Sequence, residues 1–167
     1  AFTPDSKDAD IILYNTCSVR EQAENKALSR VGRVGVHKKQ GRQVVLGVIG
    51  CMAERDGESM LGKFPVVDIL CGPAELDKLP GLLDNAVRTR GAMLADEHAS
   101  SRSSRQVALQ GGSSRRSGTL AAAADQLEML DLSRAVSPTD HSGSAYVRIT
   151  RGCNKFCTYC VVPNTRV

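Results

Sequence analysis

Three short apolar runs, separated by amphipathic segments, divide the first half of the chain. Residues 11–14, 43–49 and 66–70 are rich in Val, Ile and Leu and do not alternate with polar residues. Strands that are buried on both faces of a parallel sheet have this pattern. We therefore predict three parallel strands at these positions.

The segments between these runs have helical periodicity. Ser18 and Glu21 have the spacing of a capping box, which predicts a helix start, and Gly41 is expected to end this helix. Its apolar positions recur at helical spacing and are Val19, Ala23, Ala27, Leu28 and Val31. Pro80 suits the first turn of a later helix. The alternation predicts a Rossmann-like α/β domain with a parallel sheet over residues 1–90.

Cysteines follow the predicted strands. Right-handed crossovers place the carboxyl ends of parallel strands along one edge of the sheet, where ligands of α/β folds bind. Cys17 and Cys51 each come directly after a strand, so we expect both thiols at this edge. The alternative is that they are small buried core residues. Cys71 also ends a strand, and we interpret it as an incidental apolar residue.

The composition changes after the first domain. Residues 98–118 contain seven Ser and three Gly, which predicts a linker, placed at 91–140. Residues 145–149 alternate between apolar and polar and predict a strand that begins a second domain over 141–167. Residues 88–116 hold six Arg against two acidic residues and so account for the net charge of +4. This stretch is interpreted either as a nucleic-acid-binding patch or as a solvated segment.

The overall composition narrows the class of protein. With 41% hydrophobic and 24% charged residues, the chain is typical of a globular protein. No apolar run approaches the roughly 18 residues of a membrane span. Six Cys are too few for a small disulfide scaffold, and three of them cluster within eight residues. This clustering is typical of a metal site in a reducing compartment, so we predict a cytoplasmic protein.

The clustered cysteines are Cys153, Cys157 and Cys160, with C-x3-C-x2-C spacing. Three thiolates on one short loop can hold three irons of a cubane and leave the fourth iron open. A zinc site that uses His141 as a fourth ligand and three incidental cysteines are the alternatives.

Three motifs carry a resemblance to a known family. Residues 152–163 resemble the radical S-adenosylmethionine (SAM) signature of the methylthiotransferases. Residues 15–21 and 50–54 resemble the amino-terminal domain of that family, and Ser-Val-Arg-Glu is most similar to its tRNA-modifying MiaB branch. The resemblance implies a methylthiotransferase α/β domain followed by the first strand of a truncated radical-SAM (β/α) barrel.

The same resemblance implies cofactors and their ligands. It implies SAM and two 4Fe–4S clusters, with the SAM-binding cluster held by the three clustered cysteines and Tyr159 near SAM. Cys17 and Cys51 correspond to two of three ligands of an auxiliary cluster, and the third corresponds to a position before Ala1. No catalytic residue separate from the cluster ligands is implied.

The reaction implied by the resemblance adds a methylthio group to carbon 2 of a prenylated adenosine beside the anticodon. One SAM supplies the methyl group, and another is cleaved reductively to a radical. Carbon 2 of adenine does not react by acid/base chemistry, so a cofactor must supply the reactivity. The implied partners are the tRNA anticodon stem-loop and an electron donor of flavodoxin or ferredoxin type; the sulfur source is left open.

Both ends of the sequence look cut, so we expect a fragment that is inactive by itself. Two alternatives on the same scaffold are the ribosomal-protein and the threonylcarbamoyl-adenosine methylthiotransferases. An alternative from another class is a non-catalytic, zinc-stabilised nucleic-acid-binding module.

Overall fold

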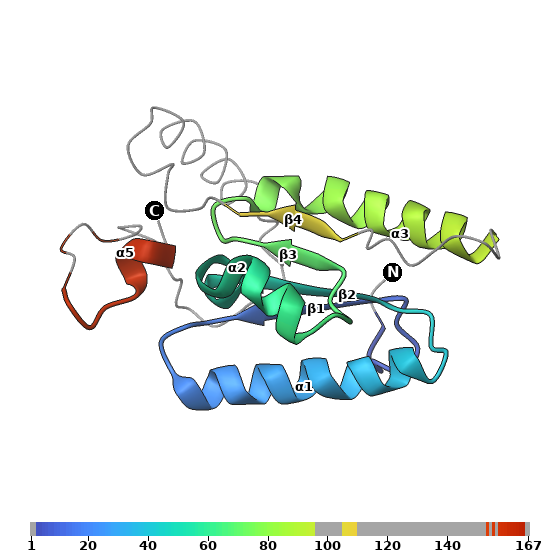
Figure 1. The fold of residues 1–167 in the computed structure, drawn as a ribbon, viewed down its shortest axis with the longest axis horizontal. Helices are drawn as coiled ribbons and strands as arrows, with labels where there is room; N and C mark the ends of the chain where they lie inside the picture. The colour runs from blue at the N-terminus through green and yellow to red at the C-terminus, as the bar shows by residue number, and fades with distance from the viewer. Residues whose placement is uncertain (1–2, 96–104, 110–152, 154, 156, 166–167) are drawn as a thin grey trace, which may run out of the picture.

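A parallel sheet covered by helices forms the centre of the computed structural model, which describes residues 3–95, 105–109, 153, 155 and 157–165 (Figure 1). In chain order the elements are β1 (Ile11–Thr16), α1 (Glu21–Lys39), β2 (Val45–Gly50), α2 (Cys51–Lys63), β3 (Ile69–Cys71), the short 3-10 helix η1 (Leu76–Lys78), α3 (Leu79–Ala95), β4 (Gln106–Ala108) and α5 (Val162–Thr165). In the described part of the chain, no helix is long and apolar enough to cross a membrane.

The four strands lie in the order β1-β2-β3-β4, and every neighbouring pair is parallel. Thr16 is aligned with Gly50, and Ile49 with Cys71, so the first three strands end close to one level. This arrangement confirms the predicted α/β class with a parallel sheet. It also confirms the three predicted strands, with shifts of at most three residues at their ends.

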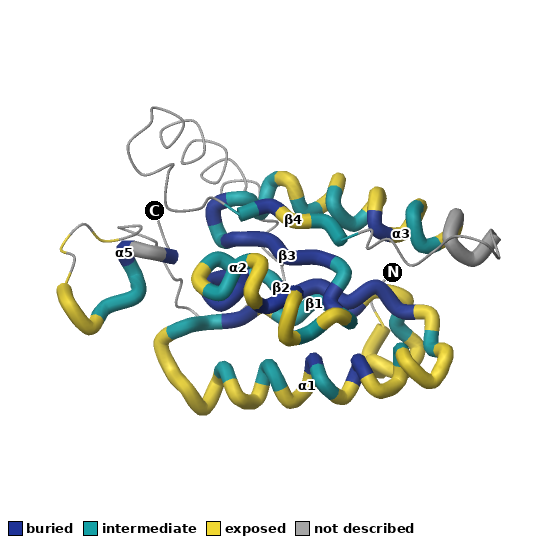
Figure 2. The backbone as a smooth tube through the Cα atoms, viewed as in Figure 1, coloured by how far each residue is buried: buried dark blue, intermediate teal, exposed yellow. Residues whose placement is uncertain are grey.

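The sheet buries side chains on both faces, as the lack of alternation predicted. Leu46 and Val48 of β2 belong to a core cluster with α1 and α2, which includes Val31 and Met52. Val45 points to the other face, where a smaller cluster packs against α3. α1 and α3 therefore cover opposite faces of the sheet, and Figure 2 shows the buried residues concentrated between them.

The predicted capping box at the start of α1 is wrong. α1 begins at Glu21 after Arg20, whose side chain makes no capping hydrogen bond. Ser18 Oγ is buried and has no hydrogen-bond partner within the described chain. The physical reason is that β1 continues two residues beyond its apolar run, so Ser18 lies in the connection and not at the helix end. The predicted helix end is confirmed, because Gly41 follows α1 with a φ of 95°.

The sheet extends into the range that we expected to be a linker. Residues 91–140 contain the end of α3 and also β4, which pairs with β3 through Ile69 and Gln106. Three residues among serines and arginines are too short for a hydrophobic pattern, so β4 was not predicted. Residues 96–104 and 110–140 of this range, and the predicted strand at 145–149, lie outside the described residues, so the domain limits stay predictions.

A charged cluster holds the amino edge of the sheet together. Lys38 Nζ at the end of α1 donates to Asp68 Oδ2 at 2.5 Å and to the Val66 carbonyl at 2.8 Å. The same Asp68 oxygen accepts from the Leu46 amide at 2.8 Å. From α3, Arg90 Nη1 donates to the Val44 carbonyl at 2.5 Å and lies 3.9 Å from Asp68. These contacts join two helices to the starts of β2 and β3.

Candidate metal and cofactor site

Cys17 and Cys51 lie next to the ends of neighbouring strands. Cys17 follows Thr16, the last residue of β1, and Cys51 follows Gly50, the last residue of β2. Thr16 and Gly50 are register partners, and paired parallel strands lie about 4.8 Å apart. The structure therefore confirms the expectation that both residues lie at the carboxyl edge of the sheet.

The backbone before Cys51 makes a tight turn that only glycine suits. Gly50 has a φ of 95°, and a Cβ atom there would lie 2.5 Å from the Thr16 carbonyl oxygen and 2.8 Å from Asn15 Oδ1. Across the same pair of strands, Thr16 Oγ1 donates to the Ile49 carbonyl at 2.7 Å. The close approach of the two backbones fixes where the connections that carry the two cysteines leave the sheet.

Cys51 is the first residue of α2 and is buried. A thiolate at a helix amino end is stabilised by the helix dipole. Gly57 interrupts α2, however, with a non-helical φ of 51° and ψ of −136°. The regular segment that Cys51 begins is therefore short, and its dipole is weaker than that of an unbroken helix of this length.

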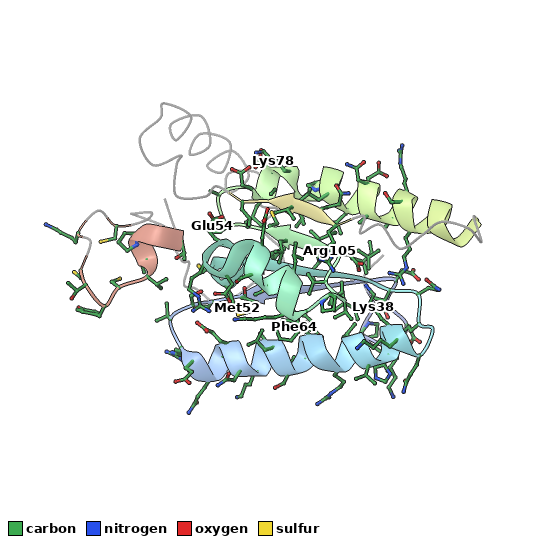
Figure 3. The ribbon with its side chains drawn as sticks, viewed as in Figure 1. Lys38, Met52, Glu54, Phe64, Lys78 and Arg105 are labelled. Carbon is green, nitrogen blue, oxygen red and sulfur yellow. The ribbon has the colours of Figure 1, made fainter. Side chains whose placement is uncertain are left out.

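Glu54 is a residue of this edge that was not predicted from the sequence. It lies in the first turn of α2, and its carboxylate approaches Gly72 so closely that a Cβ atom on Gly72 would collide with it. Figure 3 shows Glu54 at the upper side of α2 and Met52 at its lower side, toward α1, where Met52 belongs to the core. An acidic residue three positions after Cys51 at a helix start was the signal that could have pointed to it.

Cys71 behaves as a buried thiol. Its side chain is inaccessible to solvent, and Sγ donates to the Glu75 carbonyl oxygen at 3.2 Å. Burial is the main cause that raises the pKa of Cys71 to about 12, and the neighbouring Glu75 carboxylate adds to the effect. A thiol that keeps its proton is a poor metal ligand. The geometry thus agrees with the interpretation of Cys71 as an apolar residue.

The clustered cysteines lie on an exposed loop before α5. Cys153 and Cys157 are exposed, Cys160 is half-buried, and a turn closes with the Cys160 amide donating to the Cys157 carbonyl at 2.9 Å. Tyr159 lies in this turn with 91% of its surface exposed. The loop is attached by α5, which contacts α2 and in which Thr165 is buried.

All six cysteines are free thiols, and the described residues contain no group of three potential ligands arranged to hold a metal ion. Two cysteines follow neighbouring strand ends at the carboxyl edge, and three lie within eight residues on the loop. In donor chemistry these sulfurs fit an iron–sulfur cluster, because thiolates are its usual ligands. His141, the fourth ligand of the zinc alternative, lies outside the described residues. Which residues ligate stays a prediction.

A comparison with protein-family models gives a match to the amino-terminal part of the chain. Residues 1–72 match the model described as "Uncharacterized protein family UPF0004". The match covers β1, α1, β2, α2 and β3, and with them Cys17 and Cys51. This part of the chain is similar to that family.

Curated relatives share one printed name, tRNA-2-methylthio-N(6)-dimethylallyladenosine synthase. The chain is 39% identical to the protein from Rhodopirellula baltica over 159 residues, which is 95% of this chain and 30% of the relative. It is 37% identical to that from Coxiella burnetii over 165 residues and 36% identical to that from Bordetella pertussis over 166, each 99% of this chain and 31% of the relative. The resemblance to the tRNA-modifying methylthiotransferases is thereby confirmed, and the chain spans about a third of their length.

Proposed function

We propose that the protein to which this chain belongs is a tRNA methylthiotransferase that acts on a prenylated adenosine beside the anticodon by radical-SAM chemistry. One observation carries the proposal. The match to the Coxiella burnetii relative covers 99% of this chain and so includes both the carboxyl-edge cysteines and the cysteine loop. The printed name of that relative supplies the substrate, a tRNA adenosine that carries a dimethylallyl group.

In this proposal Cys153, Cys157 and Cys160 hold the SAM-binding 4Fe–4S cluster. The bound cluster supplies the electron that cleaves SAM. The exposure of Cys153 and Cys157 leaves their sulfurs open to a cluster and its cofactor, and the exposed Tyr159 ring in the same turn provides a surface for SAM. The peptide hydrogen bond between Cys160 and Cys157 holds the last two ligands on one turn.

Cys17 and Cys51 supply two sulfurs toward an auxiliary cluster at the carboxyl edge. Thr16 and Gly50 fix the two connections next to each other, and the buried neighbours of Cys51, Met52 and Ala53, exclude water on the side of the sheet. The proposed partners are the tRNA anticodon stem-loop and an electron donor of flavodoxin or ferredoxin type. Free thiols and a tRNA substrate belong in a reducing compartment, so the proposed location is the cytoplasm.

Anaerobic reconstitution with iron and sulfide tests this assignment. We expect a brown protein with a broad absorption band near about 400 nm. Cys153→Ala should remove the part of this band that belongs to the SAM-binding cluster. The matched control Cys71→Ala removes a buried thiol that stays protonated at neutral pH and should leave the band unchanged. Stoichiometric zinc with no uptake of iron would contradict the proposal and favour the zinc-stabilised binding module.

A further inference from the structure

Four basic side chains form a row along α1, here called the α1 stripe: Lys26, Arg30, Arg33 and His37. Their spacing of four, three and four residues places them on one side of the helix, each about 5–6 Å from the next. All four are exposed. From Lys26 to His37 the stripe is about 16 Å long, given a rise of 1.5 Å per residue.

The α1 stripe points away from the sheet. The side of α1 that meets the core carries Val31, Val34 and Gly35, all buried. Figure 3 shows side chains with nitrogen ends projecting from the opposite side of this helix. The row is therefore presented to whatever approaches the outer surface of the domain.

No acidic side chain neutralises the stripe within the described residues. Glu24 belongs to the side of α1 that faces α2, where its carboxylate accepts from Arg55 at 2.6 and 3.0 Å. Glu21 is nine residues before Arg30, about two and a half helical turns, and so lies on the opposite side of α1. Lys26, Arg30 and Arg33 form no ion pair with any described residue, unlike Arg55, Lys78 and Arg88.

The arginines of the other basic stretch, 88–116, are engaged where the structure describes them. Arg88 pairs with Asp84 at 2.9 Å, Arg90 donates to backbone carbonyls at the amino edge, and Arg105 donates to the Pro65 carbonyl at 3.4 Å. These three guanidinium groups serve the fold. The charged groups of Lys26, Arg30 and Arg33, by contrast, have no ion-pair partner among the described residues and are open to a ligand.

Lys26, Arg30 and Arg33 are three unneutralised cations in this row, and they complement a chain of phosphates, since each phosphate that is neutralised releases condensed counterions. We infer that the α1 stripe binds the sugar–phosphate backbone of the RNA substrate. This inference rests on the proposed function, because tRNA is the polyanion that the proposed reaction brings to the protein. The contact contributes affinity and orientation and reads no base sequence.

The test measures binding of the 167-residue chain to a fluorescent RNA hairpin of anticodon stem-loop size. The variant is Lys26→Gln/Arg30→Gln/Arg33→Gln. The matched control, Lys7→Gln/Lys63→Gln/Arg88→Gln, removes the same number of exposed charges from elsewhere on the surface. Glutamine has nearly the helix propensity of Lys and Arg, so circular dichroism should show both variants folded.

We expect the stripe variant to bind at least about tenfold more weakly at about 50 mM salt and to lower the slope of log K against log salt by about 2. The control should keep most of the affinity and most of the slope. Equal losses in both variants, or no loss in the stripe variant, would overturn the inference. A wild-type chain that binds no RNA would overturn it too, while cluster reconstitution would still decide the proposed function separately.

Discussion

Lys38 at the end of α1 and Asp68 just before β3 are joined by a 2.5 Å contact between Nζ and Oδ2, and both side chains are largely covered. Burial lowers the pKa of Lys38, and the Asp68 carboxylate opposes this effect by favouring the ammonium form. The same carboxylate oxygen satisfies the Leu46 amide at the start of the sheet. One oxygen atom therefore stabilises a helix end and a strand start together.

Asp68→Ala should lower the free energy of unfolding by about 2–4 kcal/mol, because the covered Lys38 ammonium loses its carboxylate partner and the buried Leu46 amide loses its acceptor. Urea unfolding at neutral pH measures the loss. The control is Asp84→Ala, which removes an exposed carboxylate paired with Arg88 and should cost at most about 1 kcal/mol. Similar losses in the two variants would show that the Lys38–Asp68 pair has no special role.

Gly50→Ala should destabilise the protein by about 2 kcal/mol or more, because a positive φ and a close backbone contact both oppose a Cβ atom. The control is Gly62→Ala in α2, where a Cβ would meet nothing within 4 Å and helix propensity improves. Thermal unfolding followed by circular dichroism should show a lower midpoint for the first variant and an unchanged or higher one for the second. An unaffected Gly50→Ala protein would rule out the tight turn.

Stability should fall in alkaline solution partly because of Cys71. Its pKa is raised to about 12 in the folded state, so the unfolded chain loses this proton first, near the ordinary value of about 8.5. Between these two values the unfolded state binds fewer protons, and the stability contribution present below about pH 8.5 is lost as pH rises. In urea unfolding between about pH 8 and pH 10, the fall should be about 1–2 kcal/mol smaller in Cys71→Ala. An identical fall in stability in the wild type and in Cys71→Ala would contradict the raised pKa of Cys71.

The cysteines should differ widely in their reactivity toward iodoacetamide in the cluster-free protein. Cys153 and Cys157 are exposed and should be modified first, whereas Cys71 is buried and protonated and should react only after unfolding. Peptide mapping by mass spectrometry after short exposure gives the order. The same reaction in urea is the control, because there all six thiols should react alike. Early modification of Cys71 in the native protein would be inconsistent with its burial.

The parallel sheet could be predicted from the sequence because the runs at 11–14, 43–49 and 66–70 are rich in apolar residues and do not alternate with polar ones, which is typical of strands buried on both faces. The shared edge of Cys17 and Cys51 could be predicted too, since parallel connectivity alone requires it. The start of α1 was predicted wrongly because Asn15 and Thr16 extend β1 by backbone hydrogen bonds that leave no hydrophobic signal. The Lys38–Asp68 pair joins residues thirty positions apart, so no local sequence pattern predicts it.

The remaining features depend on contacts that only the folded chain creates. β4 pairs through its backbone with β3, so its short and mixed composition carries little information. The Glu54 carboxylate lies against Gly72, and the two residues become neighbours only when β3 joins the sheet. The ligands on the cysteine loop were predicted from spacing and resemblance.

The charged cluster at the amino edge and the cysteines at the carboxyl edge lie at opposite ends of the same strands. The two ends of the strands should therefore differ in how substitutions affect stability. Substitutions that strengthen the charged cluster around Asp68 can raise the stability of the domain without changing the carboxyl edge. The residues around Cys17 and Cys51 can then vary during evolution at a smaller cost to folding.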